Sequence, residues 1–168
     1  MPTLQLILGR KIPFRPLKEP VSTSYANQRT SYGRIPCRMS PSCLAGLAIV
    51  VVEDHDDARR YLGLFLGQLG AKVMVARNAF EGLELIKNSL PDLVLSDIKM
   101  PGMDGFELLD EIRALGSDAG GSVPVIAMSA FFSQTDRART HYAEFRACLP
   151  KPFTPDKLVD TILSVLQI

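Results

Sequence analysis

The chain has 168 residues, of which 46% are hydrophobic and 22% charged, and its formal net charge is +1. This length and balance suit one soluble globular domain with an appendage, and no apolar run approaches the roughly 18 residues of a membrane span. The three cysteines cannot all pair within the chain and lack the spacing of a zinc site, so we expect a reducing, cytoplasmic setting.

The charge is divided unevenly along the chain. Residues 1–44 hold seven basic residues and one acidic residue, whereas residues 45–168 hold twelve basic and seventeen acidic residues. The first segment is also rich in Pro, Ser, Thr and Arg and has no sustained hydrophobic period, which predicts a disordered extension ahead of a folded domain. Alternative interpretations are a transit peptide, a tail for nucleic acid or a membrane surface, and translation that starts at Met39.

Residues 45–168 are predicted to alternate between strands and helices. Apolar runs indicate five strands, and amphipathic stretches between and after them indicate five helices. The strands are expected at residues 48–52, 73–75, 93–95, 125–128 and 147–149, and the helices at residues 56–69, 79–88, 106–115, 134–142 and 155–166. Such alternation implies right-handed βαβ crossovers and an α/β fold with a doubly wound, five-stranded parallel sheet.

Local signals set several details of these helices. Gly70 is placed to end the first helix, and Asp56 or Asp57 is expected to cap its start. Pro155 suits the first turn of the last helix. The apolar positions of the first two helices are Tyr61, Leu62, Phe65, Leu66, Leu69, Phe80, Leu83, Leu85 and Ile86.

Polar residues stand where the predicted strands end, the edge at which doubly wound sheets bind ligands. They are Glu53 and Asp54 after the first strand, Asp97 after the third, Ser129 after the fourth and Lys151 after the fifth. Three carboxylates this close repel by about 4 kcal/mol per pair at 4 Å and a dielectric near 20, so the cluster calls for a cation. All-oxygen ligands and an open site favour Mg²⁺.

A metal beside a carboxylate, a hydroxyl and a lysine suits phosphoryl transfer, which depends on positioning and charge neutralisation. Asp97 is the expected nucleophile, because it leaves the middle strand next to the acidic pair. Lys151 and Mg²⁺ would neutralise the transferred group, and the Ser129 hydroxyl would donate a hydrogen bond to it. His55 and His141 are expected to face solvent, since neither has a second His or Cys at ligand spacing.

Four motifs in order carry a family resemblance. Val52-Glu53-Asp54, the stretch SDIKMPGMDG at residues 96–105, Met128-Ser129-Ala130 and Lys151-Pro152-Phe153 are similar to those of CheY-like receiver domains of two-component signalling, over about residues 46–168. The resemblance implies a flavodoxin-like strand order 2-1-3-4-5 and phosphorylation by a histidine kinase or phosphotransfer protein. For the site it implies a phosphorylated Asp97, Mg²⁺ on Glu53, Asp54, Asp97 and the Lys99 backbone carbonyl, phosphoryl oxygens on Ser129 and Lys151, and a cis Lys151–Pro152 bond.

The resemblance also frames the expected output. The sequence stops soon after the last predicted helix, so we expect a stand-alone regulator or phosphorelay shuttle that signals through an unidentified partner protein, without direct DNA binding. The last helices would allow a homodimer, and no enzymatic activity is expected beyond Mg²⁺-dependent self-phosphorylation and dephosphorylation. Two alternatives are a receiver-type module that needs no phosphorylation and an aspartyl-phosphate hydrolase, although the latter family places an acidic aspartate where Lys99 stands.

Two positions near the site bear on the switch. Many family members carry an aromatic residue three positions before the lysine, and here that position is Cys148, so the usual rotating-ring readout lacks its ring. Phe131 follows Ser129 by two residues, and we expect this apolar side chain to shield the phosphoryl group from water and prolong the phosphorylated state.

Overall fold

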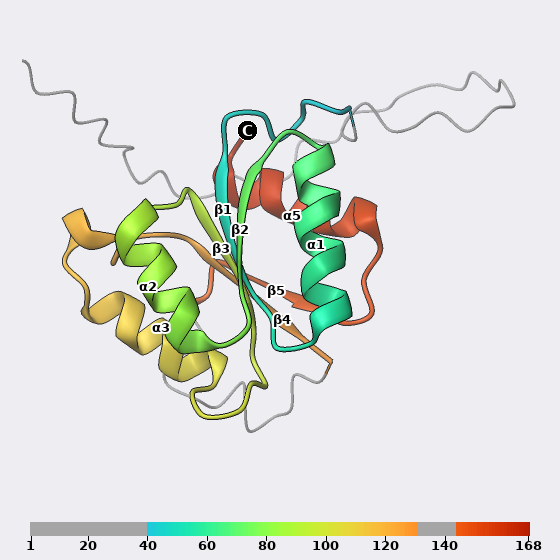
Figure 1. Ribbon diagram of the computed structural model, residues 1–168. Helices are drawn as coiled ribbons and strands as arrows, with labels where there is room; N and C mark the ends of the chain where they lie inside the picture. The colour runs from blue at the N-terminus through green and yellow to red at the C-terminus, as the bar shows by residue number, and fades with distance from the viewer. Residues whose placement is uncertain (1–39, 131–143) are drawn as a thin grey trace, which may run out of the picture. The chain divides into compact units, whose positions relative to one another are not determined.

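The computed structural model describes residues 40–130 and 144–168, in which strands and helices alternate along the chain (Figure 1). The described elements are β1 (Ala48–Val52), α1 (Asp56–Gln68), β2 (Lys72–Ala76), α2 (Ala79–Ser89), β3 (Leu93–Asp97), α3 (Gly105–Ala114), a 3₁₀ turn (Ser117–Ala119), β4 (Val125–Ser129), β5 (Ala147–Pro150) and α5 (Pro155–Leu166). The helix predicted over residues 134–142 lies outside the described residues. Every other predicted element is confirmed, with ends that differ by at most two residues.

The strands form one parallel sheet in the order β2-β1-β3-β4-β5. Val50 of β1 lies opposite Met74 of β2 on one side and Val94 of β3 on the other. This arrangement confirms the predicted doubly wound, flavodoxin-like fold and its strand order. The order reverses between β1 and β3, so the carboxyl ends of these two strands border the place where such sheets bind ligands.

Helices cover both faces of the sheet, with α2 and α3 on one face and α1 and α5 on the other (Figure 1). Successive side chains of a strand point to opposite faces. Ile49 and Val51 therefore pack with α1 and α5, whereas Val50 and Val52 pack with α2 and α3. Because the central strands are covered on both sides, their sequences are continuous apolar runs rather than alternating ones.

The N-cap of the first helix differs from the prediction, although the helix begins at the expected residue. Its N-cap is His55, which makes no side-chain capping bond, and Asp56 and Asp57 are first-turn residues, so the predicted aspartate cap is wrong. The cap lies one residue before Asp56, which places both carboxylates beside the unpaired N–H groups of the first turn, where negative charge is favourable. The predicted end is confirmed, because Gly70 follows the C-cap with a φ of +93°.

Two aromatic residues predicted among the apolar helix positions lie at the surface. Tyr61 is 51% exposed and Phe80 is 60% exposed, whereas Leu62 and Leu66 fill the core next to α1. Tyr61 stacks on the half-buried Phe65, with ring centroids 5.8 Å apart, so it covers the edge of the apolar stripe rather than its centre. None of the helices in the described part of the chain has the length and apolar character needed to cross a membrane.

The packed core begins ahead of β1. Leu44 is fully buried in the layer beside α1 and α5, and its backbone N–H donates a hydrogen bond to the carbonyl of Leu69 over 3.0 Å. The core therefore includes the last residue of the segment that the sequence assigns to the extension.

Candidate functional site

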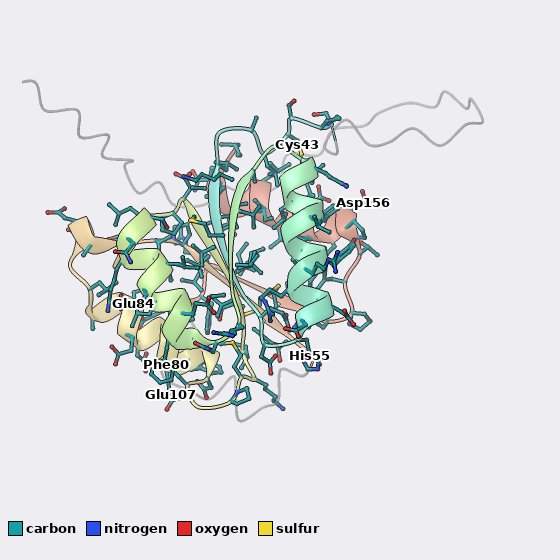
Figure 2. The ribbon with its side chains drawn as sticks, in the orientation of Figure 1. Cys43, His55, Phe80, Glu84, Glu107 and Asp156 are labelled. Carbon is teal, nitrogen blue, oxygen red and sulfur yellow. The ribbon has the colours of Figure 1, made fainter. Side chains whose placement is uncertain are left out.

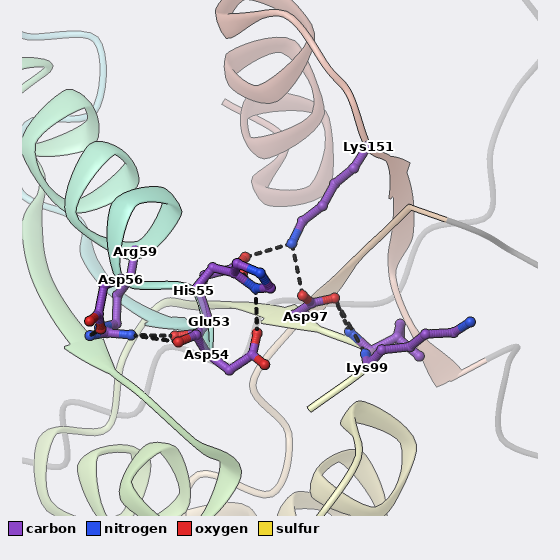
Figure 3. Close-up of polar contacts among 9 residues, drawn as sticks. Glu53, Asp54, His55, Asp56, Arg59, Asp97, Lys99 and Lys151 are labelled. Carbon is purple, nitrogen blue, oxygen red and sulfur yellow. Dashed lines mark hydrogen bonds and ion pairs between the residues drawn. The ribbon is translucent and has the colours of Figure 1, made fainter. Parts of the chain in front are cut away.

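The residues predicted from the strand ends gather at the carboxyl edge of the sheet. Glu53 and Asp54 follow β1, Asp97 ends β3, Ser129 ends β4, and Lys151 follows β5. Figure 3 shows Glu53 and Asp54, Asp97 and Lys151 converging on one small region from the ends of three separate strands. Parallel strands place all their carboxyl ends on one edge, which is why residues up to 98 positions apart in the chain make contact here.

Lys151 joins two carboxylates. Its Nζ donates to Glu53 Oε2 over 2.6 Å and to Asp97 Oδ2 over 2.9 Å (Figure 3). Its backbone N–H donates to the carbonyl of Ser129 over 2.7 Å, which ties the start of the Lys151 loop to the end of β4. The Lys151–Pro152 peptide bond is cis, as the resemblance implied.

Backbone groups hold the other oxygen of Asp97. Its Oδ1 accepts a hydrogen bond from the N–H of Ile98 over 2.7 Å and a longer one from the N–H of Lys99 over 3.4 Å. The Lys99 side chain extends away from the cluster in Figure 3, so its contribution here comes from the backbone. Asp97 is only 8% exposed, and its carboxylate is therefore fixed in direction before any ligand arrives.

Glu53 has one carboxylate oxygen without a partner. The residue is 1% exposed, and its Oε1 accepts no hydrogen bond from the described residues. A buried oxygen in this state costs free energy, typically about 1–3 kcal/mol or more for a charged group, unless a ligand satisfies it. The oxygens of Glu53, Asp54 and Asp97 are hard ligands of the kind that Mg²⁺ takes, so the residues present fit this ion.

The charges of the cluster shift two pKa values. Burial, and to a lesser extent the negative charge of Asp97, raise the pKa of Glu53, and together they exceed the lowering by Lys151 and by the backbone N–H of His55. Burial alone would lower the pKa of Lys151, but the hydrogen bonds and charges of Asp97 and Glu53 raise it above its ordinary value. Lys151 therefore stays positive at neutral pH, yet it is one cation against the three carboxylates of Glu53, Asp54 and Asp97, and the site still attracts positive charge.

His55 lies at the open side of the acidic pair. Its side chain is 81% exposed, which confirms the predicted solvent-facing position. However, its Nδ1 lies 3.2 Å from Asp54 Oδ1 and 3.9 Å from Glu53 Oε1 (Figure 3). The contact of this ring with the adjacent carboxylates was not predicted, because only a second His or Cys at ligand spacing was taken as a sign of metal binding.

Arg59 is a second residue whose contact with the acidic pair was not predicted from the sequence. One of its guanidinium nitrogens, Nη1, donates to the backbone carbonyls of Glu53 over 2.9 Å and of Asp54 over 3.2 Å, and the other, Nη2, contacts Asp56. The guanidinium therefore holds the backbone of the acidic pair from the first turns of α1 (Figure 3). Figure 2 shows His55, the N-cap of α1, at this same end of the helix. The sequence feature that could have predicted this role is an arginine one turn into the helix, from where its side chain can reach the end of the preceding strand.

We expect Arg59→Ala to weaken Mg²⁺ binding roughly tenfold, since groups that orient metal ligands commonly contribute this much. The exposed neighbour Arg60 is the matched control, because Arg60→Ala removes the same charge without freeing the two carbonyls. Calorimetric titration with Mg²⁺ measures both affinities. Equal affinities for the two variants would mean that Arg59 does not position the pair.

Of the other residues singled out from the sequence, the structure describes two and leaves two outside the described residues. Ser129 is 1% exposed and stands one residue beyond Met128, which pairs with Asp97 across β3 and β4. Cys148 is half-buried and packs against the core beside α2 and α3. Phe131 and His141 lie outside the described residues, so the shielding role and the solvent-facing position predicted for them stay predictions.

Comparison with known proteins shows which family the chain resembles. The model of the response regulator receiver domain family matches residues 49–163. A protein of Leptolyngbya boryana, named as an uncharacterized 14.6 kDa protein in the sodA1 3′ region, is 41% identical over 116 residues, which are 69% of this chain and 87% of that protein. The sensor histidine kinase RcsC of Salmonella typhi is 35% identical over 69% of this chain, and the response regulator MprA of Mycobacterium sp. (strain KMS) is 33% identical over 71%. The match spans only 12% of RcsC and 50% of MprA.

Solved structures agree as well. Chemotaxis protein CheY4 of Vibrio cholerae superposes with a TM-score of 0.66 at 25% identity, over 72% of this chain and 99% of that one. The receiver domain of the sensor histidine kinase PA1611 of Pseudomonas aeruginosa PAO1, solved with magnesium coordinated in its active site cleft, gives a TM-score of 0.66 at 28% identity over 74% and 100% of the two chains. With the strand order, the acidic strand ends and the Lys151 contacts, these matches show that the chain belongs to the response regulator receiver domain family of two-component signalling.

Proposed function

We propose that Asp97 accepts a phosphoryl group from a histidine kinase or a phosphotransfer protein in a Mg²⁺-dependent reaction, and that the phosphorylated chain signals by binding a partner protein. One observation carries this proposal above the others. The Asp97 carboxylate is held by Lys151 beside a buried Glu53 oxygen that has no partner among the described residues. The proposed nucleophile Asp97, the cation of Lys151 and a Glu53 oxygen available to a metal ion thus lie together.

Each residue has a defined part in this reaction. Glu53, Asp54, Asp97 and the backbone carbonyl of Lys99 would hold Mg²⁺, which when bound neutralises negative charge on the phosphoryl oxygens. An Asp97 oxygen forms a bond to phosphorus while the P–N bond of the donor phosphohistidine breaks, and the imidazole leaves with the electron pair.

Lys151 and Ser129 receive the transferred group. Lys151 already contacts Asp97 Oδ2, and it stays charged to pair with a phosphoryl oxygen. The buried Ser129 hydroxyl would donate a hydrogen bond to another oxygen.

Phosphorylation would change the charge that Lys151 and Ser129 face. An aspartyl phosphate brings roughly −1.5 to −2 charges and three acceptor oxygens in place of one carboxylate charge. Because the Lys151 backbone is tied to the end of β4, a new contact at its ammonium group can be transmitted to both β4 and β5. A reversal from 1:99 to 99:1 needs about 5.5 kcal/mol of preference for the active state.

The same proposal covers the cellular setting. We propose that the exchange takes place in the cytoplasm, where thiols such as those of Cys43 and Cys148 stay reduced. The output would be a protein partner rather than DNA, and the last helices are the proposed surface for a homodimer.

Intact mass after incubation with acetyl phosphate and Mg²⁺ tests the phosphoacceptor directly. We expect the wild-type chain to gain the mass of one phosphoryl group, and Asp97→Asn to gain none, because an amide oxygen is a far weaker nucleophile than a carboxylate. Chelation of Mg²⁺ should suppress the gain in wild type. Asp57→Asn is the matched control, because Asp57 is an exposed aspartate in the first turn of α1, and it should be phosphorylated like wild type.

The outcomes separate the competing interpretations. A gain in Asp97→Asn equal to that of wild type would place the acceptor elsewhere. No gain in wild type with acetyl phosphate or with a phosphorylated histidine phosphotransfer protein would favour a module that binds its partners without phosphorylation.

A further inference from the structure

We propose that His55 is an additional ligand at this metal site and raises its affinity for Zn²⁺ above that of an all-oxygen receiver site. The inference rests on the proposed cation site of Glu53 and Asp54, and it concerns which ions that site accepts. It would make metal identity an input to the switch, beside phosphorylation.

The geometry brings three ligand atoms together. His55 Nδ1, an oxygen of Asp54 and an oxygen of Glu53 all lie within 4.8 Å of one another. The Nδ1 atom is 3.2 Å from Asp54 Oδ1 and 3.9 Å from Glu53 Oε1. Metal–ligand bonds of about 2.0–2.2 Å place neighbouring ligand atoms at separations of this size, so one ion can contact all three.

The unpartnered oxygen of Glu53 is independent evidence for a ligand at this place. Glu53 is 1% exposed, and Lys151 takes its Oε2, which leaves Oε1 on the side of Asp54 and His55. A buried carboxylate oxygen is costly without a partner, and a cation between Glu53, Asp54 and His55 would supply one. In Figure 3 the His55 ring stands over the acidic pair with Nδ1 directed at Asp54.

The imidazole nitrogen of His55 should raise the affinity for one ion more than for the other. Mg²⁺ takes oxygen ligands and water, so a nearby imidazole nitrogen adds little to its binding. Zn²⁺ takes imidazole nitrogen together with carboxylate oxygen, and Glu53, Asp54 and His55 offer that mixture. Because the His55 side chain is 81% exposed, the ring can adjust around an ion without repacking the core.

The test compares Zn²⁺ and Mg²⁺ binding to the full chain by calorimetric titration. We expect His55→Ala to lower Zn²⁺ affinity at least roughly tenfold, the scale of losing one contributing group, and to change Mg²⁺ affinity by about twofold or less. Folding should be preserved, because the His55 side chain makes no capping bond to α1. His141→Ala removes the other histidine of the chain and shows whether a loss of Zn²⁺ affinity is specific to His55.

A spectroscopic readout identifies the ligand atom. In ¹⁵N-histidine-labelled protein, Zn²⁺ should shift the Nδ1 resonance of His55, and Mg²⁺ should not. An unshifted His55 resonance at saturating Zn²⁺ would overturn the inference.

Asp54→Asn separates this inference from the function on which it rests. It should weaken the binding of both Mg²⁺ and Zn²⁺, because Asp54 is a ligand of either ion. If Asp54→Asn weakens the binding of both ions and His55→Ala weakens the binding of neither, His55 is not a ligand, but the cation site is supported. If Asp54→Asn weakens neither ion, the cation site itself is misplaced and the proposed function fails with it.

Discussion

Lys151→Met should lower the free energy of unfolding by about 2 kcal/mol at neutral pH in the absence of divalent ions. Methionine keeps most of the side-chain length but leaves the buried Glu53 and Asp97 carboxylates without their shared cation. Removing one partner of a fully buried ion pair costs about 3–5 kcal/mol, and the 24% exposure of the Lys151 side chain lets water screen part of that cost. Urea unfolding followed by circular dichroism measures the difference.

The loss should depend on pH in a defined direction. The folded-state pKa of Lys151 is raised, so its stabilisation is complete below the ordinary lysine pKa and is lost as pH rises through the folded value. Burial raises the pKa of Glu53, and loss of Lys151 raises it further. A raised acid pKa favours the protonated folded state, so the deficit of the variant should be small below the ordinary glutamate pKa and grow as pH rises through the raised value.

Glu53→Gln in the Lys151→Met background is the matched control for this explanation. It removes the buried charge that Lys151 would have neutralised. The double variant should therefore regain much of the lost stability and lose most of the pH dependence. A deficit of Lys151→Met that stays constant from acidic to neutral pH, and that Glu53→Gln does not reduce, would mean that Lys151 stabilises the fold through packing rather than through charge.

Gly105→Ala should lower the free energy of unfolding by about 2–3 kcal/mol, the cost of overpacking a site that cannot relax. Gly105 begins α3, and its N–H donates to the carbonyl of Ile98 over 2.8 Å. A Cβ at this position would lie 2.4 Å from the carbonyl oxygen of Asp97 and 2.8 Å from Cα of Ile98. Both are backbone atoms at the end of β3, so relief of the clash must displace Asp97, the proposed phosphoacceptor, and phosphorylation by acetyl phosphate should slow as well.

Gly67→Ala provides the contrast, because an added Cβ at Gly67 has no atom within 4 Å. Gly67 lies near the end of α1, where alanine is a better helix former by about 1 kcal/mol, so this variant should be slightly more stable than wild type. Urea unfolding of the two variants in parallel tests the close contact. If both shift stability in the same direction, the approach of α3 to β3 does not limit residue 105.

The main parts of the fold and the site could be predicted because they follow from patterns along the chain. Buried parallel strands are continuous apolar runs, and their carboxyl ends share one edge. Glu53, Asp97 and Ser129 therefore had to lie near one another once the strands were assigned. Lys151 needed the family motif, because a single lysine after a short strand is ordinarily a solvated charge.

Contacts that depend on side-chain direction could not be predicted in this way. The reach of Arg59 back to two carbonyls and the unpartnered oxygen of Glu53 depend on how α1 leaves β1, which no spacing rule specifies. The N-cap of α1 was misassigned for the same reason, since Asp56 satisfies a cap pattern but lies inside the helix. Tyr61 sits at the margin of the apolar stripe, where period alone does not separate core from surface.

The alternation along β1 turns neighbouring residues into separate reporters. Ile49 and Val51 report on the layer of α1 and α5, and Val50 and Val52 report on the layer of α2 and α3. Methyl resonances of consecutive residues on one strand can therefore reveal which side of the sheet responds to a ligand at its edge. A chemical-shift change at Ile49 and Val51 but not at Val50 and Val52 would show that the ligand affects the layer of α1 and α5 and not that of α2 and α3.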